Sequence, residues 1–272
     1  LYSIDNKDLK LILNCTNSHS KKKIFKNFLY YLINLIFIKN KLNKRNHINN
    51  IYSNIKKINF QCEYKKNNWQ ILPNHIVSEI KKNKIELIIK FGMNLIDVNN
   101  INFLKFGIIS FHHGDPLKYR GRPAGYYEIL NNENKMGLIL QKLNNKLDGG
   151  QILKSGYTPL YNYSYKKTLI NSLNSSKFLL KRYLNKPNLG NFEKRKLATN
   201  VYKLPSNYSV VKFIFINFYY LIKRINYGLF YEKSWSISLN KISIKNLLKN
   251  HKVFLEPNKI NIKNKDYEFY AD

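Results

Sequence analysis

The sequence predicts an α/β fold with a mainly parallel sheet, and three observations support this. Apolar strand patterns and helical patterns alternate along the chain, polar connections follow the strands, and 272 residues suffice for one large domain, or one plus part of another. Parallel sheets of this kind bind ligands beyond the carboxyl ends of their strands. We therefore expect the functional site in the loops after Phe91 and Phe111.

The first half of the chain contains the elements that open this pattern. Leu9–Cys15 alternates loosely and predicts a buried strand, residues 40–56 form a polar loop, and Ile58–Gln61 is a short strand. Asn74 begins a helix that reaches Lys82, because proline precedes it, asparagine is a good cap and apolar residues recur at helical spacing: Ile76, Val77 and Ile80.

Four apolar strands and one helix follow. The strands are expected at Ile85–Phe91, Phe106–Phe111, Met136–Lys142 and Gln151–Tyr157. Ser164 can cap a helix from Tyr165 to about Tyr183, and four leucines suggest its buried face: Leu169, Leu173, Leu180 and Leu184. Beyond residue 230, strand-like pieces at Trp235–Leu239, Lys252–Leu255 and Tyr267–Tyr270 predict a β-rich C-terminal unit.

Two stretches combine aromatic, aliphatic and basic residues. In residues 21–41 the apolar core, Phe28–Ile38, is about half as long as a membrane span, which needs about 20 residues. Ser209–Ile225 has apolar residues at helical spacing and lysines at its rim. Each stretch suits a core helix, which we expect, or a helix in weak contact with an anionic membrane, which remains the alternative.

The composition restricts the class of protein. Apolar residues make up 44% and charged residues 23%, which excludes a collagen, a disordered tail and a disulfide miniprotein. The formal charge of +31 suits nucleic acid or an anionic membrane. However, the lysines are scattered among Asn, Ile and Tyr, which favours a solvated basic surface.

The two cysteines, Cys15 and Cys62, form no C-x-x-C motif, so we expect buried thiols and a cytoplasmic location. The chain begins with Leu1 and stops at Asp272, just after an aromatic run, so we expect a fragment cut at both ends.

The densest set of reactive side chains lies in residues 110–128, S-F-H-H-G-D-P-L-K-Y-R-G-R-P-A-G-Y-Y-E, where a strand should end. Asp148 follows in a glycine-rich turn, L-D-G-G. We expect no metal, because His112 and His113 are adjacent and would point apart on an extended chain. Neither a G-x-S-x-G motif, a Cys–His pattern nor a Walker A loop is present.

The run F-G-I-I-S-F-H-H-G-D-P-L-K-Y-R-G, with the later L-D-G-G-Q-I-L, resembles the N-terminal domain of the N10-formyltetrahydrofolate-dependent formyltransferases. This family includes methionyl-tRNA formyltransferase, glycinamide ribonucleotide formyltransferase and the sugar-nucleotide N-formyltransferases. His112 precedes Tyr119 by seven residues and Asp148 by 36, as in the family. The resemblance covers about residues 5–190 and implies a Rossmann-like formyltransferase fold, whose first strand and helix would precede Leu1.

The motif also departs from the family pattern. Ser110 replaces the catalytic Asn, and His113-Gly114-Asp115 replaces the more usual residues. The S-F-H-H-G-D form resembles a branch whose domain is joined to a β-propeller-like region, as in glucosamine inositolphosphorylceramide transferases. We therefore expect a catalytic domain over residues 1–190, a linker with an amphipathic helix over 191–228, and the start of a truncated propeller-like domain over 229–272.

The resemblance implies roles for individual residues. His112 would donate to the oxyanion that develops at the formyl group, Asp148 would keep it protonated and remove the amine proton through water, and Ser110 or His113 would fill the role of Asn. N10-formyltetrahydrofolate would contact Phe91, Gly92, Met93, Asn94, Leu95, Gln141, Lys142, Leu143 and Asn144. The acceptor would contact Asp115, Tyr119, Arg120 and Arg122, although an arginine here could equally stabilise a turn.

The expected function is transfer of a formyl group from N10-formyltetrahydrofolate to a primary amine on an amino sugar or sugar nucleotide. Methionyl-tRNA formylation is one alternative, since the basic charge suits contacts to a tRNA backbone. A catalytically degenerate module that binds a glycan or a membrane is the other, favoured by Ser110 in place of Asn.

Overall fold

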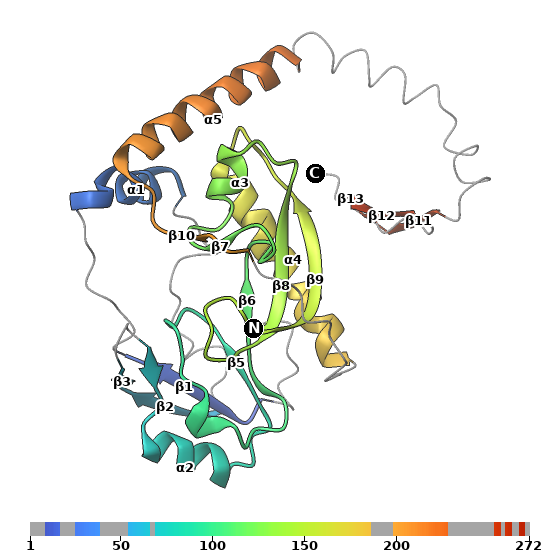
Figure 1. Ribbon diagram of the computed structural model, residues 1–272. Helices are drawn as coiled ribbons and strands as arrows, with labels where there is room; N and C mark the ends of the chain where they lie inside the picture. Colours follow the sequence, from blue (N-terminus) through green and yellow to red (C-terminus); the bar gives the residue numbers. More distant parts are fainter. Residues whose placement is uncertain are drawn as a thin grey trace. The chain divides into compact units, whose positions relative to one another are not determined.

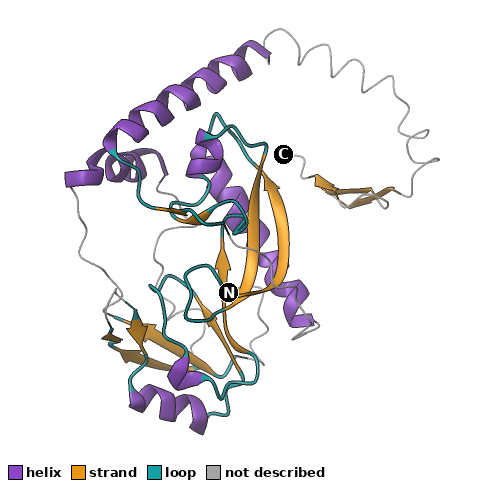
Figure 2. Ribbon diagram, in the orientation of Figure 1, coloured by secondary structure: helices purple, strands orange, loops and turns teal. Residues whose placement is uncertain are grey.

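The computed structural model describes residues 9–16, 25–38, 54–65, 69–185 and 198–227, and the strands 253–256, 259–262 and 267–269 (Figure 1). The chain divides into two compact units, Leu1–Phe218 and Tyr219–Asp272. Helices and strands alternate through the first unit, which confirms the predicted α/β class (Figure 2). Within these residues, no helix combines the length and apolarity that crossing a membrane requires.

The site is built on a four-stranded sheet in the order β5-β6-β8-β9, whose strands all match predicted ones: β5 (Leu87–Lys90), β6 (Gly107–His112), β8 (Lys135–Lys142) and β9 (Gln151–Pro159). β5 and β6 are parallel, because a long connection returns the chain to the same end of the sheet. β8 is antiparallel to both β6 and β9, and the turn that carries Asp148 joins it to β9.

The N-terminal part packs a helix against short strand pairs. β1 (Leu11–Cys15) is parallel to β2 (Lys56–Phe60), and β3 (Glu63–Tyr64) is antiparallel to β4 (Gln70–Ile71). Helix α2 (Asn74–Lys82) confirms the predicted bounds and the predicted buried face of Ile76, Val77 and Ile80. A single-turn helix, Asn99–Ile101, lies between β5 and β6 in the chain.

Helix α4 (Tyr165–Asn185) covers one face of β8 and β9. The Lys167 amide donates to Ser164 Oγ at 3.2 Å, which confirms the predicted cap. Of the four predicted leucines, Leu180 is buried, Leu169 and Leu184 are half-buried and pack against the core, and Leu173 is half-buried. The buried face also includes Tyr165, Leu179 and Tyr183 and three small polar residues, Thr168, Ser172 and Ser176.

The two aromatic-basic stretches are helical but only partly buried. Residues 25–38 comprise a 3₁₀ turn, α1 (Phe28–Ile33) and a π-helical turn, and α5 covers Asn207–Tyr227. On α5, Val210 and Phe213 are buried, whereas nine large apolar side chains are exposed: Tyr208, Val211, Ile214, Phe215, Phe218, Tyr219, Leu221, Ile222 and Ile225. The expectation of a core helix therefore holds for one side of α5 and is wrong for the other.

Three further features complete the fold. β7 (Arg120–Gly121) pairs in parallel with β10 (Val201–Tyr202), which brings a late segment against the motif. The Sγ atoms of Cys15 and Cys62 are 3.4 Å apart, and the two residues form no disulfide. An antiparallel sheet near the C-terminus consists of β11 (Val253–Glu256), β12 (Lys259–Ile262) and β13 (Tyr267–Phe269). The expected strand Trp235–Leu239 lies outside the described residues. The propeller-like domain stays a prediction.

Candidate active site

His112 and Asp148 meet at the end of β6. Their Nδ1 and Oδ1 atoms are 3.3 Å apart, and the two side chains are 9% and 14% exposed. His112 is the last residue of β6, and the turn between β8 and β9 presents Asp148 with a left-handed φ of 47°. The carboxylate therefore faces one ring nitrogen in a largely desolvated position, where an ion pair is stronger than on the surface.

Backbone groups hold both partners in place. The Gly121 amide donates to Asp148 Oδ2 at 2.7 Å, so both carboxylate oxygens are engaged. The Nε2 atom of His112 lies 3.1 Å from the carbonyl oxygen of Tyr119, which can only accept, so Nε2 carries a hydrogen. The imidazole is fixed at both ends and presents an N–H on the side away from Asp148.

Ser110 lies two residues before His112, on the same face of β6. It is 8% exposed, and its Oγ has only long bonds, 3.5 Å to Lys90 O and 3.4 Å to Phe111 O. Its register partners are Lys90 on β5 and Gln141 on β8. Gln141 is 3% exposed and its Oε1 has no hydrogen-bond partner, so this row of three polar side chains is incompletely satisfied.

Sequence reasoning missed Lys90. Its Nζ donates to Asn94 O at 2.9 Å, and burial lowers its pKa to about 8, against the opposing effect of Asp148. The sequence does contain a signal for this residue, because Lys90 is a charged residue near the end of an apolar strand, next to the loop where ligands are expected.

His113 does not join Ser110 and His112 on their face of the sheet. Its Nε2 lies 2.8 Å from Ser176 Oγ on α4, and Ser176 itself donates to Ser172 O at 3.0 Å, so His113 is the donor. Burial, and then His112, lower its pKa to about 4, so the ring is neutral at pH 7. This geometry favours a structural role and leaves Ser110 as the nearer replacement for Asn.

Three of the expected acceptor residues are engaged by other groups of the chain. Asp115 accepts from the Leu117 amide at 2.9 Å and from Tyr157 OH at 3.3 Å. Tyr119 OH donates to Glu133 at 3.0 Å. Arg120 donates from Nη1 to Ala198 O at 2.9 Å and from Nη2 to Leu147 O at 2.6 Å, so its guanidinium joins segments that are far apart in the sequence.

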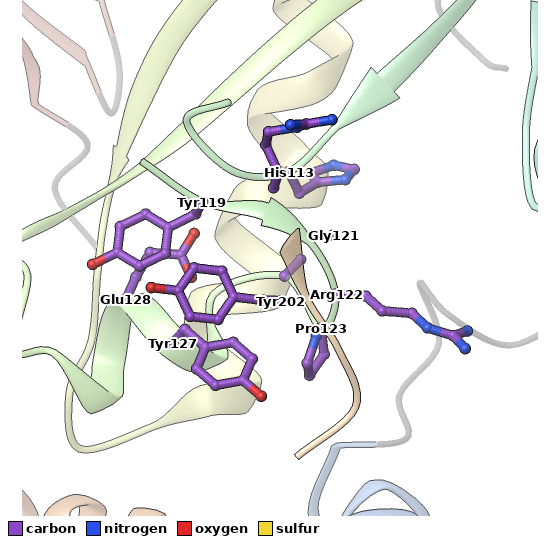
Figure 3. A pocket seen from close by; sticks show the side chains of 10 residues that line it. His113, Tyr119, Gly121, Arg122, Pro123, Tyr127, Glu128 and Tyr202 are labelled. Carbon is purple, nitrogen blue, oxygen red and sulfur yellow. The ribbon is translucent and has the colours of Figure 1, made fainter. Parts of the chain in front are cut away.

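Arg122 differs from these three residues. Its side chain is exposed and extends away from the neighbouring pocket (Figure 3). Only Arg122 of the four therefore presents a charged group to solvent, which suits a phosphate or carboxylate of a bound molecule.

The two segments expected to contact folate lie on opposite sides of β6. The first segment begins with exposed Phe91 and with Gly92, which has a φ of 65°. Met93 then packs against the core. The Asn94 amide donates to Gln70 Oε1 at 3.0 Å, so β4 holds the end of the segment, through Leu95. In the second, Leu143 N donates to Ile108 O at 2.8 Å and Asn144 Nδ2 to Gly149 O at 2.7 Å. The Lys142 side chain packs over Gly107.

A pocket beside the His112–Asp148 pair contains a second residue that sequence reasoning missed. Glu128, on α3 (Tyr126–Leu130), is 2% exposed, and its Oε1 has no hydrogen-bond partner. Burial, followed by Glu133 and Asp115, raises its pKa to about 7. The pocket is lined by His113, Tyr119, Arg120, Gly121, Arg122, Pro123, Ala124, Tyr127, Glu128 and Tyr202 (Figure 3).

In the part of the chain that the structure describes, no three His, Cys, Asp or Glu side chains lie close enough together to hold a metal ion.

Neither a protein-family model nor a curated protein sequence matches this chain. Among solved structures, a phosphoribosylglycinamide formyltransferase from Anaplasma phagocytophilum is similar, with 17% identity, a TM-score of 0.42 and coverage of 51% of this chain and 65% of its own. A sugar N-formyltransferase from Shewanella sp FDAARGOS_354 has 18% identity and a TM-score of 0.42, covering 71% of this chain and 74% of its own.

A formyltransferase from Anoxybacillus kamchatkensis, in complex with UDP-4,6-dideoxy-4-formamido-L-AltNAc and tetrahydrofolate, has 15% identity and a TM-score of 0.40, covering 71% of this chain and 84% of its own. This chain therefore spans just under two thirds of the Anaplasma protein and larger parts of the other two.

Proposed function

We propose that this chain is an N-formyltransferase that moves a formyl group from N10-formyltetrahydrofolate to a primary amine. The observation that carries the proposal is the buried His112–Asp148 pair at the end of β6, with 3.3 Å between Nδ1 and Oδ1. It occurs within the motif whose resemblance implies this chemistry. Formyl transfer needs a donor for the developing oxyanion and an acceptor for the amine proton.

The chain's own residues divide this work. His112 donates from Nε2 to the formyl oxygen after exchanging its bond to the Tyr119 carbonyl, and Asp148 orients the ring through its contact with Nδ1. The new bond joins the amine nitrogen to the formyl carbon, the bond from that carbon to folate N10 breaks, and N10 receives a proton. Ser110 Oγ is free to turn from its long bonds toward the same oxyanion.

The folate is proposed to lie between residues 91–95 and 141–144. The buried Oε1 of Gln141, which lacks a partner, fits this role because a pterin offers N–H donors. Residues 91–95 end in backbone held by Gln70, which suits a preformed wall of a binding site.

The proposed acceptor is an amino sugar or its nucleotide derivative, and the proposed location is the cytoplasm. The resemblance to the branch with a glycan-related C-terminal region supports the sugar, and two cysteines without a disulfide suit a reducing compartment. Arg122 is the residue best placed to contact an acceptor phosphate, because its guanidinium is exposed.

Calorimetry with folinic acid, followed by assays with formyl-folate and a panel of amines, tests this function. We expect the wild-type chain to bind folinic acid and His112→Gln to lose about 10²–10³ in rate. A matched control is His75→Gln, which changes an exposed histidine on α2 and should leave the rate unchanged. Lack of folinic acid binding by the wild-type chain would refute the proposal.

A catalytically degenerate binding module is the second candidate. The observation that favours it is that His112 Nε2 already has a partner in the Tyr119 carbonyl, while Ser110 has only long bonds. This candidate predicts binding of folinic acid without turnover of any amine. Methionyl-tRNA formylation, suggested by the charge of +31, instead predicts salt-dependent binding of initiator tRNA.

A further inference from the structure

Helix α5 has two apolar faces, and only one of them packs against the protein. Val210 and Phe213 are buried, and Phe213 stacks on Tyr126 of α3 with ring centroids 4.3 Å apart. Other large apolar side chains of α5 recur every three or four residues, on one further face, and are exposed. We call this face the outer stripe: Val211, Ile214, Phe215, Phe218, Ile222 and Ile225.

The outer stripe is long and strongly apolar. From Val211 to Ile225 it extends about 21 Å, at a rise of about 1.5 Å per residue. At its centre, Phe215 is 70% exposed and Phe218 is 59% exposed. Single exposed apolar side chains are common on soluble proteins, but a contiguous set along one helix face marks a binding surface.

Helix α1 exposes further apolar side chains next to the start of α5. The Leu29 amide donates to Asn207 Oδ1 at 3.1 Å, and Asn27 Nδ2 donates to Pro205 O at 2.7 Å, so the two helices begin beside each other (Figure 1). Four large apolar residues of α1 and the turn that follows it are exposed: Phe28, Leu32, Leu35 and Ile36.

The charge of α5 is entirely positive. The helix contains Lys212, Lys223 and Arg224, and no Asp or Glu occurs between Pro205 and Tyr231. Lys212 and Lys223 are exposed and lie at the same edge of the outer stripe, because about three helical turns separate them. Two exposed tyrosines, at 208 and 219, lie between this edge and the stripe.

An anionic lipid surface fits both properties of α5. The acyl chains of lipids receive apolar side chains, lysines reach the phosphates of the headgroups, and tyrosines are typical of the interface between them. A second copy of this chain fits less well, because it would bring the same lysines and a further charge of +31. Nucleic acid would match the charge but leave the stripe in water.

We propose that the outer stripe of α5 binds the surface of an anionic membrane, and that the exposed side of α1 adds to this contact. The helix lies along the surface, since α5 lacks the apolarity of a helix that crosses a membrane. The stripe buries its side chains among the lipids while Lys212 and Lys223 stay at the level of the headgroups. This inference does not rest on the proposed function, because it uses neither His112 nor Asp148.

Sedimentation of the full chain with lipid vesicles tests the partner. We compare vesicles of phosphatidylcholine and phosphatidylserine with vesicles of phosphatidylcholine alone. We expect binding to the mixed vesicles at about 0.05 M NaCl, at least about tenfold weaker binding to the neutral ones, and release from the mixed vesicles toward about 0.5 M NaCl. No binding to the mixed vesicles at low salt, or equal binding to both kinds, would overturn the proposal.

A pair of phenylalanine variants tests the outer stripe. We expect Phe215→Gln with Phe218→Gln to weaken binding to the mixed vesicles at least about tenfold, because two large side chains no longer enter the lipid. The matched control is Phe103→Gln with Phe178→Gln, which removes two exposed phenylalanines from other parts of the chain and should leave binding unchanged. Equal losses in the two pairs would contradict a role for the stripe.

A pair of lysine variants tests the local charge. Lys212→Gln with Lys223→Gln should weaken binding about tenfold. Lys166→Gln with Lys181→Gln, at exposed positions of α4, lowers the net charge equally and should weaken it less than about twofold. Equal effects would show that total charge, and not α5, attracts the chain to the vesicles, and would overturn the proposal.

Tryptophan fluorescence locates the stripe directly. We expect lipids brominated on their acyl chains to quench Phe215→Trp more than the wild type, and to quench Phe103→Trp no more than the wild type. Equal quenching of the two variants would contradict the proposal. Analytical ultracentrifugation examines the competing occupant: a dimer that Phe215→Gln with Phe218→Gln dissociates, in a wild type that ignores vesicles, would assign the stripe to a second copy and overturn membrane binding.

Discussion

The Gly121 amide donates to Asp148 Oδ2 at 2.7 Å, while the other oxygen of the same carboxylate lies 3.3 Å from His112 Nδ1. The motif that contains the imidazole thus also fixes its acidic partner. Because the Gly121 amide fixes the Asp148 carboxylate, the backbone geometry at Gly121 controls the orientation of the His112 ring.

Asp148→Asn should therefore keep the fold and lose most activity. The amide is isosteric, but it lacks the carboxylate charge that holds the imidazole through Nδ1, so we expect kcat/KM to fall about 10²–10³-fold with little change in folinic acid affinity. Steady-state kinetics and calorimetry measure the two effects. Activity within twofold of wild type would show that the pair has no catalytic role.

Gly121→Ala should destabilise the chain strongly. Gly121 has a φ of 94°, and a Cβ there would lie 2.1 Å from the Tyr202 carbonyl oxygen, so the β7–β10 pair would have to separate. We expect a loss of at least about 2 kcal/mol in the free energy of unfolding, measured with urea.

Gly92→Ala is the control for this change. Gly92 has a φ of 65°, but nothing lies within 4 Å of a Cβ placed there, so only backbone strain of about 1 kcal/mol should remain. Equal losses at the two positions would contradict the close approach of β10.

Glu128→Gln should change how stability depends on pH. Burial raises the pKa of Glu128 in the folded chain to about 7, from the ordinary 4.5 of a glutamate. Between these two pH values the folded chain therefore binds more protons than the unfolded chain, and stability falls as the pH rises. The variant removes this fall. At pH 8 it should be more stable than wild type by on the order of 3 kcal/mol, and at pH 4 nearly equal to it.

Thermal unfolding at several pH values measures this difference. A difference between the two proteins that does not vary from pH 4 to pH 8 would show that the Glu128 carboxyl group is not perturbed by burial.

Lys90→Met should have the opposite pH dependence. Burial lowers the Lys90 pKa from 10.5 to about 8, so between pH 8 and 10.5 the folded chain binds fewer protons and wild-type stability gains as pH rises. The variant lacks a group that titrates and should lose this gain, on the order of 3 kcal/mol. Lys105→Met, at a 63% exposed side chain, should retain the wild-type profile in the same melts.

Ser110→Ala separates stability from catalysis. The Oγ bonds of 3.4 and 3.5 Å are too long to stabilise the fold much, so the free energy of unfolding should change by less than about 1 kcal/mol. If the hydroxyl donates to the oxyanion, the rate should fall by about 10². An unchanged rate in the assay would assign that donation to another group, and the urea midpoint serves as the control for folding.

Much of the fold could be predicted from local pattern. The strands at 85–91, 106–111, 136–142 and 151–157 and the helix at 74–82 match the structure within a few residues, since hydrophobic period and cap chemistry are properties of short segments. The predicted face of α4 was incomplete, because leucine spacing gives no weight to small polar residues such as Ser172 and Ser176, which are buried.

The pairing of residues in the site was only partly predictable. The resemblance of the motif to a known family predicted that His112 and Asp148 act together, and the structure places them in contact. The environment of Arg120 was not foreseeable, because its partners come from elsewhere in the chain: Ala198 and Leu147.

The sequence by itself determined which segments form most of the strands and helices, and the resemblance of its motif led to the prediction that His112 and Asp148 lie together. Only the tertiary structure decided that Arg120 is occupied by two carbonyl groups and that Glu128 retains an unpaired oxygen. The physical reason is that desolvation and competition for hydrogen bonds depend on contacts between segments far apart in the chain, which no local pattern encodes.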